Sequence, residues 1–357
     1  MTNRNLQNAI RGSLIGGAAG DALGYAIEFK RENEIFRLYG ENGITEYALS
    51  GSGKALISDD TQMTLFTAEG LLWARTGDSA RPRHAIADAY QNWLLTQNDT
   101  YEHVKTLPLD APSRLLTEPE IFALRAPGNT CLSALYHASH APAYPDDYIA
   151  SPCNDSKGCG GVMRVAPVAL DPVLRRRMTE DEIALEAAQA AAITHGHSLG
   201  YMPAALLCLI IGRIVFPDGE RKALKEIVRE STETVGRLFG GDPHLDTLTR
   251  LMDLATELSE NGQRDLDNIH RLGEGWIAEE ALAIAVYCAL RYPNDFSKCL
   301  IASVNHKGDS DSTGAIAGNI LGALVGFDAI DERWKNRLEL KDLILEIADA
   351  LCEDDPA

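Results

Sequence analysis

The sequence predicts an all-α protein that folds as a single domain over residues 1–357. Apolar residues recur three or four positions apart through most of the chain, which is the period of a helix that buries one face. Alternating, strand-like patterns are confined to residues 44–48 and 165–169. A chain of this length would ordinarily divide into about two domains. However, no Pro/Gly/Ser-rich linker or low-complexity tract interrupts it, so we expect one domain.

The individual helices follow from this periodicity and from capping signals. Residues 59–75 place Met63, Phe66 and Trp73 on one side of a helix. The segment Thr179-Glu-Asp-Glu182 matches a capping box, which opens a helix that runs to about residue 193. The same spacing predicts further helices near residues 5–24, 80–96, 129–139, 199–216, 220–239, 244–260, 278–291, 313–325 and 331–351.

Two of these helices carry a glycine at every fourth position. The stripes are Gly12, Gly16, Gly20 and Gly24, and then Gly314, Gly318, Gly322 and Gly326. Each glycine inside a helix costs about 1 kcal/mol relative to alanine, so the stripes need a compensating reason. Residues four apart form one ridge, and a ridge without side chains lets two backbones approach closely. We therefore expect two tightly packed core helices, which would fix the adjoining carboxylates of Asp21, Asp309 and Asp311.

Charge and cysteine content narrow the classes of function. The chain has 33 basic and 52 acidic residues, a formal charge of −19, which argues against nucleic acid or an anionic membrane as a partner. Its seven cysteines form no C-x-x-C pair and predict reduced thiols in the cytoplasm. The most apolar run, residues 204–211, is too short to cross a bilayer and predicts a core helix. The glycine-rich residues 14–20, closed by Asp21, do not resemble a signal peptide.

Two acidic clusters stand at the starts of predicted helices. They are Ser58-Asp59-Asp60-Thr61 and Asp309-Ser310-Asp311-Ser312. Either cluster alone is also explained as a helix cap. Together they offer oxygen donors without a thiolate, a set that suits Mg²⁺, Mn²⁺ or Ca²⁺ and disfavours Zn²⁺. Four buried carboxylates would repel one another strongly without cations.

A glycine-rich loop and a histidine segment complete the candidate site. Ser156, Gly158, Cys159 and Gly160 lie in a loop before an apolar stretch, where exposed backbone amides can hold phosphate oxygens without positive charge. An ordinary turn explains the same composition. His195 stands where a predicted helix ends, so it fits a helix cap or a contact to ribose or phosphate.

Read in order, these segments resemble the ADP-ribosylglycohydrolase family, which includes the dinitrogenase-reductase-activating and ADP-ribosylarginine hydrolases. The matching residues are Gly16-x-x-x-Gly20-Asp21, Glu28-Phe29, Ser58-Asp59-Asp60-Thr61, Ser156-x-Gly158-x-Gly160-x-x-Met163-Arg164, Thr194-His195-Gly196-His197 and Gly308-Asp309-x-Asp311-x-x-Gly314. The matches span residues 16–326. The resemblance implies an all-α globule with a central cleft that holds two Mg²⁺ or Mn²⁺ ions.

The resemblance also assigns roles residue by residue. It implies Ser58, Asp59 and Asp60 as ligands of one ion, and Asp309, Asp311 and Ser312 as ligands of the other, with Asp311 bridging. Glu28 matches an acidic loop residue that lies beside the metals in relatives. Ser156, Gly158, Cys159 and Gly160 match the loop that contacts diphosphate and ribose, and His195 matches a ligand-contacting histidine.

Two positions depart from the family pattern or leave it open. Many relatives carry Asn where this chain has Cys159, so the resemblance implies a backbone role there and not a side-chain contact. Some relatives use a further aspartate between the first acidic cluster and the glycine-rich loop. Asp88, Asp99 and Asp110 are the candidates for it in this chain.

The activity that the resemblance implies is hydrolysis of the bond between ADP-ribose and a protein side chain. Asp60 or Glu28 would accept the proton of the attacking water. The second acidic cluster and the Thr-His-Gly-His segment resemble those of arginine-linkage members more closely than those of serine-linkage members, so the resemblance implies arginine as the linkage. ADP-ribosylserine and O-acetyl-ADP-ribose are the alternative substrates. The alternatives to hydrolysis are a structural role, as in lens crystallins, and an immunity-type protein that binds a cognate ADP-ribosyltransferase.

Overall fold

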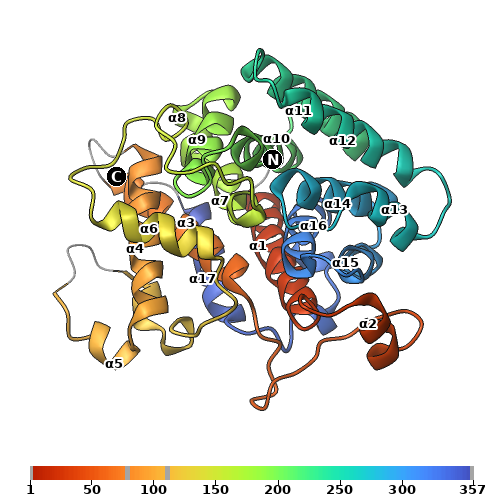
Figure 1. Ribbon diagram of the computed structural model, residues 1–357, viewed down its shortest axis with the longest axis horizontal. Helices are drawn as coiled ribbons and strands as arrows, with labels where there is room; N and C mark the ends of the chain where they lie inside the picture. The colour runs from red at the N-terminus through yellow and green to blue at the C-terminus, as the bar shows by residue number, and fades with distance from the viewer. Residues whose placement is uncertain (1–2, 77–80, 109–112, 354–357) are drawn as a thin grey trace.

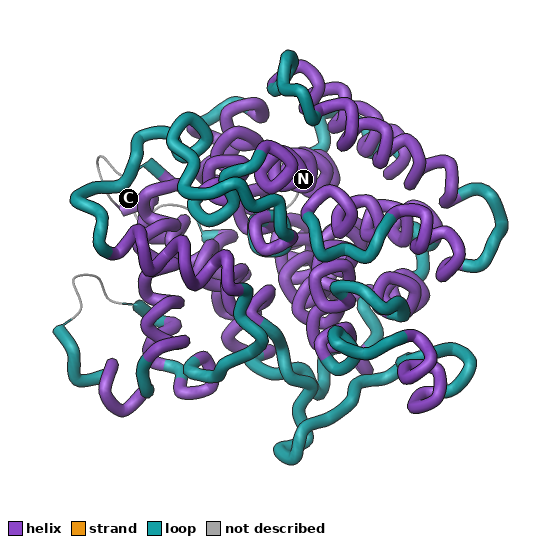
Figure 2. Tube along the Cα trace, in the orientation of Figure 1, coloured by secondary structure: helices purple, strands orange, loops and turns teal. Residues whose placement is uncertain are grey.

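The computed structural model describes residues 3–76, 81–108 and 113–353 (Figure 1). Helices make up the regular structure of these residues, and Figure 2 draws them as purple tubes joined by loops. Within the same residues, β-type pairing is limited to two isolated bridges, Ala55 with Leu338 and Gly158 with Ile277. The predicted all-α class is confirmed.

Two antiparallel helices, α1 (Asn3–Tyr25) and α16 (Ser310–Val325), lie against each other near the middle of the molecule (Figure 1). Their glycine stripes face one another. A β-carbon at Gly20 would lie 2.0 Å from the carbonyl oxygen of Gly314, and one at Gly16 would lie 2.3 Å from that of Gly318. Real β-carbons do not approach backbone this closely, so the two helices can pack at this distance only through glycine. The expected tight packing is confirmed.

The other helices surround this pair. α3 (Asp59–Thr76) packs on α4 (Pro82–Asn98), and α9 (Glu180–Ala192) packs on α10 (Ser198–Val215). The remaining longer helices are α6 (Asn129–Ser139), α11 (Leu224–Leu238), α12 (Leu245–Ser259), α14 (Ala278–Arg291), α15 (Phe296–Val304) and α17 (Lys341–Cys352). The shorter ones are α2 (Glu32–Tyr39), α5 (Tyr101–Val104), α7 (Ala166–Leu170), α8 (Pro172–Arg177) and α13 (Asp265–Leu272).

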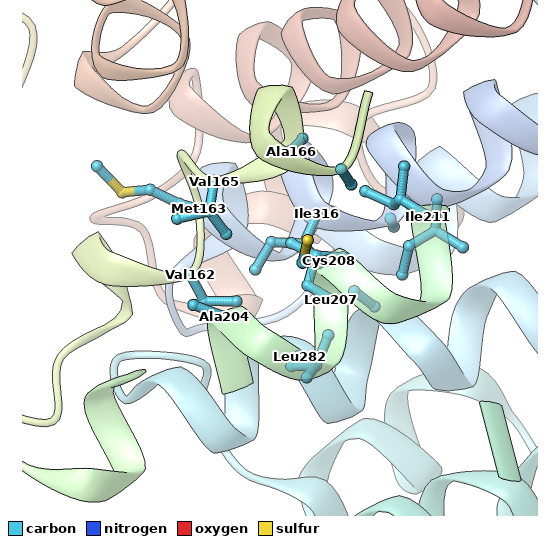
Figure 3. Packing of buried hydrophobic residues seen from close by; sticks show 14 of the residues in the cluster. Val162, Met163, Val165, Ala166, Ala204, Leu207, Cys208, Ile211, Leu282 and Ile316 are labelled. Carbon is cyan, nitrogen blue, oxygen red and sulfur yellow. The ribbon is translucent and has the colours of Figure 1, made fainter. Parts of the chain in front are cut away.

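The helix α10 lies at the centre of the apolar core. Figure 3 shows Leu207 and Cys208 of α10 close to Ile316 of α16 and Leu282 of α14. Within the described part of the chain, α10 is the one helix that is long and apolar enough to cross a membrane, and 94% of that segment is buried inside the protein. The core helix predicted around residues 204–211 is therefore confirmed, although the apolar helix is 18 residues long.

Three expectations for secondary structure are wrong. Residues 44–48 are irregular, and residues 165–169 lie mostly in α7, because within the described part of the chain neither segment has a neighbouring strand with which to pair. The single helix expected over residues 331–351 is interrupted. A short 3-10 turn, Glu332–Trp334, is followed by α17 only after Leu340, whose φ of 55° is left-handed and cannot continue a right-handed helix.

Candidate functional site

The start of α3 is held by a buried aspartate on α1. One carboxylate oxygen of Asp21 accepts a hydrogen bond from the Ser58 amide at 2.9 Å, and the other accepts from the Thr61 amide at 3.1 Å and from the Thr61 hydroxyl. The Ser58 hydroxyl accepts from the Asp60 amide at 3.1 Å, so Ser58 caps the helix as predicted. Burial, with repulsion from Asp311, raises the pKa of Asp21 to about 7.

The start of α16 presents the second acidic cluster. Asp309 is the N-cap residue, and its carboxylate accepts from the Ser312 amide at 3.3 Å, while the Asp309 amide donates to the carbonyl of Glu274 at 2.8 Å. Asp311 accepts from the same Ser312 amide at 3.0 Å. The helix begins three residues earlier than expected, which puts both aspartates at its positive N-terminal end.

The fold brings the two clusters and Glu28 together. One carboxylate oxygen from each of Glu28, Asp309 and Asp311 lies within 4.8 Å of the others. Asp59 and Asp60 are close enough for repulsion from Asp311 to raise their pKa values, although burial is the larger cause. Burial and then repulsion from Asp311 raise the pKa of Glu28 to about 11.

Two of these carboxylates each have one buried oxygen atom without a partner. Glu28 is 7% exposed and Asp60 is 2% exposed, and Oε2 of Glu28 and Oδ2 of Asp60 have no hydrogen-bond donor. An ionised carboxylate in this position is costly unless a cation or a donor reaches it. Four carboxylates at two helix starts, with Glu28 from the turn after α1, therefore fit divalent cations. Ser58 and Ser312 stand beside them as further oxygen donors.

The glycine-rich loop is partly occupied by contacts within the protein. The Gly158 amide donates to the Ser156 hydroxyl at 3.3 Å, and the Cys159 amide donates to the Trp276 carbonyl at 3.2 Å. The backbone then forms a short 3-10 turn, Cys159–Gly161. In this conformation, two of the amides that were expected to hold phosphate are engaged elsewhere.

The imidazole of His195 lies directly under this loop. A β-carbon at Gly160 would come within 2.9 Å of the ring, and one at Gly158 within 3.2 Å, so the two glycines leave room for it. Nδ1 of His195 is 2.8 Å from the Thr194 hydroxyl oxygen. Burial, and then the nearby Arg164 guanidinium, lower the pKa of His195 to about 3, so the ring is neutral.

Arg164 belongs to the matching motif, but its function could not be assigned from the sequence. Its buried guanidinium donates to the Thr194 hydroxyl at 2.7 Å and to the carbonyl of Ala190 at 3.1 Å, and it stacks on the Tyr90 ring at 4.3 Å. These contacts hold the end of α9 and, through Thr194, the ring of His195. An arginine before Val-Ala-Pro was the only sequence signal for this role.

A thiol also contacts the second acidic cluster. The Sγ atom of Cys159 donates a hydrogen bond to Oδ2 of Asp309 at 2.7 Å, whereas the group of side chains close enough together to hold a metal ion consists of carboxylates in the described residues. The two residues are 150 positions apart in the sequence, so no local pattern could show this contact. Burial, and then repulsion from Asp309 and Asp60, raise the pKa of Cys159 well above the usual value for a thiol.

Phe29, the residue after Glu28, forms an aromatic pair with Trp276. Phe29 and Trp276 stack with centroids 6.2 Å apart, and they are 73% and 39% exposed. Trp276 also lines a pocket of about 520 Å³ together with Glu32, Glu274 and Glu280. Glu32 and Glu274 pair with His270 and Lys307, respectively, so only part of the acidic charge at this pocket is compensated.

Two of the three candidates for the further aspartate lie in the described residues, and both have partners outside the acidic clusters. Asp88 is hydrogen-bonded to Tyr144, and Asp99 accepts from the Thr100 amide at 2.7 Å and pairs with His103. Asp110 lies outside the described residues.

Comparisons with known proteins agree with this architecture. A sequence model of the ADP-ribosylglycohydrolase family matches residues 2–357. The ADP-ribosyl-[dinitrogen reductase] glycohydrolase of Rhodospirillum rubrum is 26% identical over 348 residues, which cover 96% of this chain and 94% of that protein. ADP-ribosylhydrolase ARH3 of Danio rerio is 24% identical, over 96% of this chain and 90% of the relative.

A solved structure titled "ADP-ribosylglycohydrolase-related protein complex" has the same fold. The two structures superimpose with a TM-score of 0.66, the alignment covers 98% of each chain, and the aligned sequences are 24% identical. The match of the family model runs over nearly the whole chain and includes both acidic clusters, the glycine-rich loop and His195. On this basis the chain is a member of the ADP-ribosylglycohydrolase family.

Proposed function

We propose that this protein is a metal-dependent hydrolase that releases ADP-ribose from modified protein side chains, with arginine as the preferred linkage. One observation carries the proposal. Buried carboxylates from the turn after α1 and from the starts of α3 and α16 come together, and two of their oxygen atoms lack any donor. Such an arrangement is stable when divalent cations neutralise it.

The proposed ligands are the residues of the two helix starts. Ser58, Asp59 and Asp60 would hold one Mg²⁺ or Mn²⁺ ion, and Asp309, Asp311 and Ser312 the other, with Asp311 shared. When bound, two such ions supply Lewis acidity and lower the pKa of a coordinated water. Asp21 would keep the first ligand set in place through its hydrogen bonds to Ser58 and Thr61.

The protein's own groups would bind the substrate and move the proton. Glu28 and Asp60 each have an unpartnered oxygen that can accept a proton from the attacking water, as a carboxylate does in glycoside hydrolysis. The loop around Gly160 and the neutral ring of His195 would position ribose and diphosphate through uncharged donors. A binding surface of this kind suits an anionic substrate on a protein with a net charge of −19.

The arginine linkage is supported by the surroundings of Glu28. The planar guanidinium of a modified arginine can stack against an aromatic ring, and the exposed pair Phe29 and Trp276 offers two. The carboxylates of Glu32, Glu274 and Glu280 next to Trp276 would attract a cationic side chain to this side of the site. Serine-linked and acetyl-linked ADP-ribose carry no cation there.

The test offers arginine-, serine- and acetyl-linked ADP-ribose at equal concentration with Mg²⁺ or Mn²⁺ and compares the rates of ADP-ribose release. The arginine-linked substrate should react fastest. Trp276→Ala should raise KM for this substrate while the affinity for free ADP-ribose stays unchanged, and Trp276→Phe should restore most of the loss. Faster release from either of the other substrates would contradict the linkage, and no release from any would contradict hydrolysis.

Two further expectations from the sequence remain proposals. The seven unpaired thiols support a reducing compartment, the cytoplasm, as the site of action. Binding of a cognate ADP-ribosyltransferase is an expectation that a pull-down with the purified transferase would test. If this contact inhibits the transferase, it should persist in an Asp60→Ala variant that has lost hydrolysis.

A further inference from the structure

The glycine-rich loop carries a lysine, Lys157, between Ser156 and Gly158. A lysine beside backbone amides that can hold phosphate is a common phosphate ligand. In this structure its Nζ donates to Oε1 of Glu279 at 2.9 Å, and the Glu279 side chain is only 3% exposed. Lys157 is therefore paired with a buried carboxylate in the first turn of α14.

The second oxygen of this carboxylate makes the pair costly to break. Oε2 of Glu279 is buried and has no hydrogen-bond donor in the described part of the chain, so the contact with Lys157 compensates the charge of Glu279. Removing one partner of a buried ion pair leaves an uncompensated charge, which is strongly unfavourable. A substrate diphosphate would have to meet that cost to draw Lys157 away.

The backbone of the loop also runs beside the segment that leads into α14. The Ala278 amide donates to the Lys157 carbonyl at 2.9 Å, and the Cys159 amide donates to the Trp276 carbonyl at 3.2 Å. The isolated antiparallel β-bridge at Gly158 lies between these two hydrogen bonds. Together they form a short ladder, and the ion pair closes it at the end nearest α14.

The segment that leads into α14 contacts the candidate site as well. The carbonyl of Glu274 accepts from the Asp309 amide at 2.8 Å, and the ring of Trp276 stacks on that of Phe29. The register of the ladder therefore sets where the glycine-rich loop lies relative to the second acidic cluster and the aromatic pair. The ion pair fixes this register, because sliding the loop by one residue would take the lysine away from Glu279.

We propose that the ion pair of Lys157 and Glu279 positions the glycine-rich loop for the ADP-ribose part of the substrate, and that Lys157 does not itself contact the diphosphate. The identity of the ligand rests on the proposed function. Both members of the pair are positioning residues. They act through the backbone of the loop around Gly160 and through the place of Trp276.

Calorimetric titration with ADP-ribose distinguishes the two roles that Lys157 could have. Glu279→Gln keeps the size of the side chain and removes its charge. If the pair positions the loop, Glu279→Gln and Lys157→Met should each weaken ADP-ribose binding by about tenfold, and the double variant should lose no more than either single one. Solvent reaches the lysine, whose side chain is 41% exposed, and this screening keeps the expected loss moderate.

Two variants serve as controls. Lys157→Arg preserves the charge pair and should retain most of the affinity for ADP-ribose. Glu260→Gln removes a charge from the exposed pair of Lys225 and Glu260, which joins α11 to the residue after α12, and it should leave ADP-ribose binding unchanged.

Kinetics separate positioning from other roles. With ADP-ribosylarginine, Glu279→Gln should raise KM by about tenfold, while kcat and the gain in melting temperature on adding Mg²⁺ stay near the wild-type values. Tighter ADP-ribose binding in Glu279→Gln would show that the released lysine contacts the diphosphate, and would overturn the proposal. Unchanged affinity in both single variants together with a lower melting temperature would also overturn it, since the pair would then only stabilise the fold.

Amide hydrogen exchange tests the positioning without a ligand. The Cys159 and Ala278 amides, which donate across the ladder, should exchange faster in Glu279→Gln than in the wild type or in Glu260→Gln. Equal exchange in all three proteins would contradict the role of the pair. If the wild-type protein does not bind ADP-ribose, the proposed function is wrong, and the exchange rates then decide by themselves whether the pair holds the loop.

Discussion

The contact between α1 and α16 allows a quantitative prediction for Gly318→Ala. A β-carbon at residue 318 would lie 2.0 Å from the carbonyl oxygen of Gly16 and 2.5 Å from its carbonyl carbon. A normal carbon–oxygen contact is about 3.4 Å, so the helices would have to separate by roughly 1.4 Å at this point. Both obstructing atoms are backbone, so no side-chain rotation can relieve the clash.

The separation should cost more than an ordinary overpacked site. Overpacking costs about 1–3 kcal/mol, and a gap of about 1 Å along an interface loses up to half of its dispersion energy. We therefore expect Gly318→Ala to lower the free energy of unfolding by at least about 3 kcal/mol. Because α1 carries Asp21 and α16 carries Asp311, the variant should also bind Mg²⁺ more weakly.

Urea unfolding at 25 °C with a chelator present measures the first effect, and isothermal titration with Mg²⁺ measures the second. Gly236→Ala is the matched control, since it makes the same change within α11 where a β-carbon would meet no atom within 4 Å. That control should gain up to about 1 kcal/mol from helix propensity. A Gly318→Ala protein with unfolding free energy within about 0.5 kcal/mol of the wild type would refute the reasoning.

Three further predictions concern the site. Asp60→Ala or Asp311→Ala should abolish turnover and narrow the difference in melting temperature between Mg²⁺-loaded and chelated protein. If isothermal titration shows that either variant still binds two ions as the wild type does, the ligand assignment is contradicted. The pKa values of Asp21 and Glu28 are raised to about 7 and about 11, so the chelated folded protein binds protons that the unfolded chain has released. The stability of the chelated protein should therefore fall as pH rises from about 4 through 7. The gain in melting temperature on adding Mg²⁺ should grow over the same range. Thermal scans at several pH values check both trends. Gly160→Val should weaken ADP-ribose binding, because the valine side chain would meet the His195 ring. Cys159→Ala should keep most of the activity with Mg²⁺. An equal loss of ADP-ribose affinity in the two variants would show that the thiol has a role in ligand binding.

The longer helices were predictable because their signal is local. Apolar periodicity and a capping box mark α3 and α9 within one or two residues of their observed ends. Short helices such as α13 and α15 carry too few turns to show a period and are stabilised mainly by their neighbours. Residues 165–169 were predicted as a strand because a run of five residues is too short to distinguish a strand from a helix before its packing is known.

The sequence by itself determined the fold class, the family resemblance, and the two helix starts that carry acidic residues, because each depends on residues close together in the chain. The glycine stripes even indicated which two helices would touch. The family resemblance placed Glu28 beside the same metal site as Asp309 and Asp311, and the structure brings their carboxylates within 4.8 Å of one another. Tertiary structure alone decided that Arg164 holds Thr194 beside His195. It also decided that Cys159 meets Asp309 across 150 positions, because the loop before α14 holds the cysteine backbone at that place and no sequence period extends over such a distance.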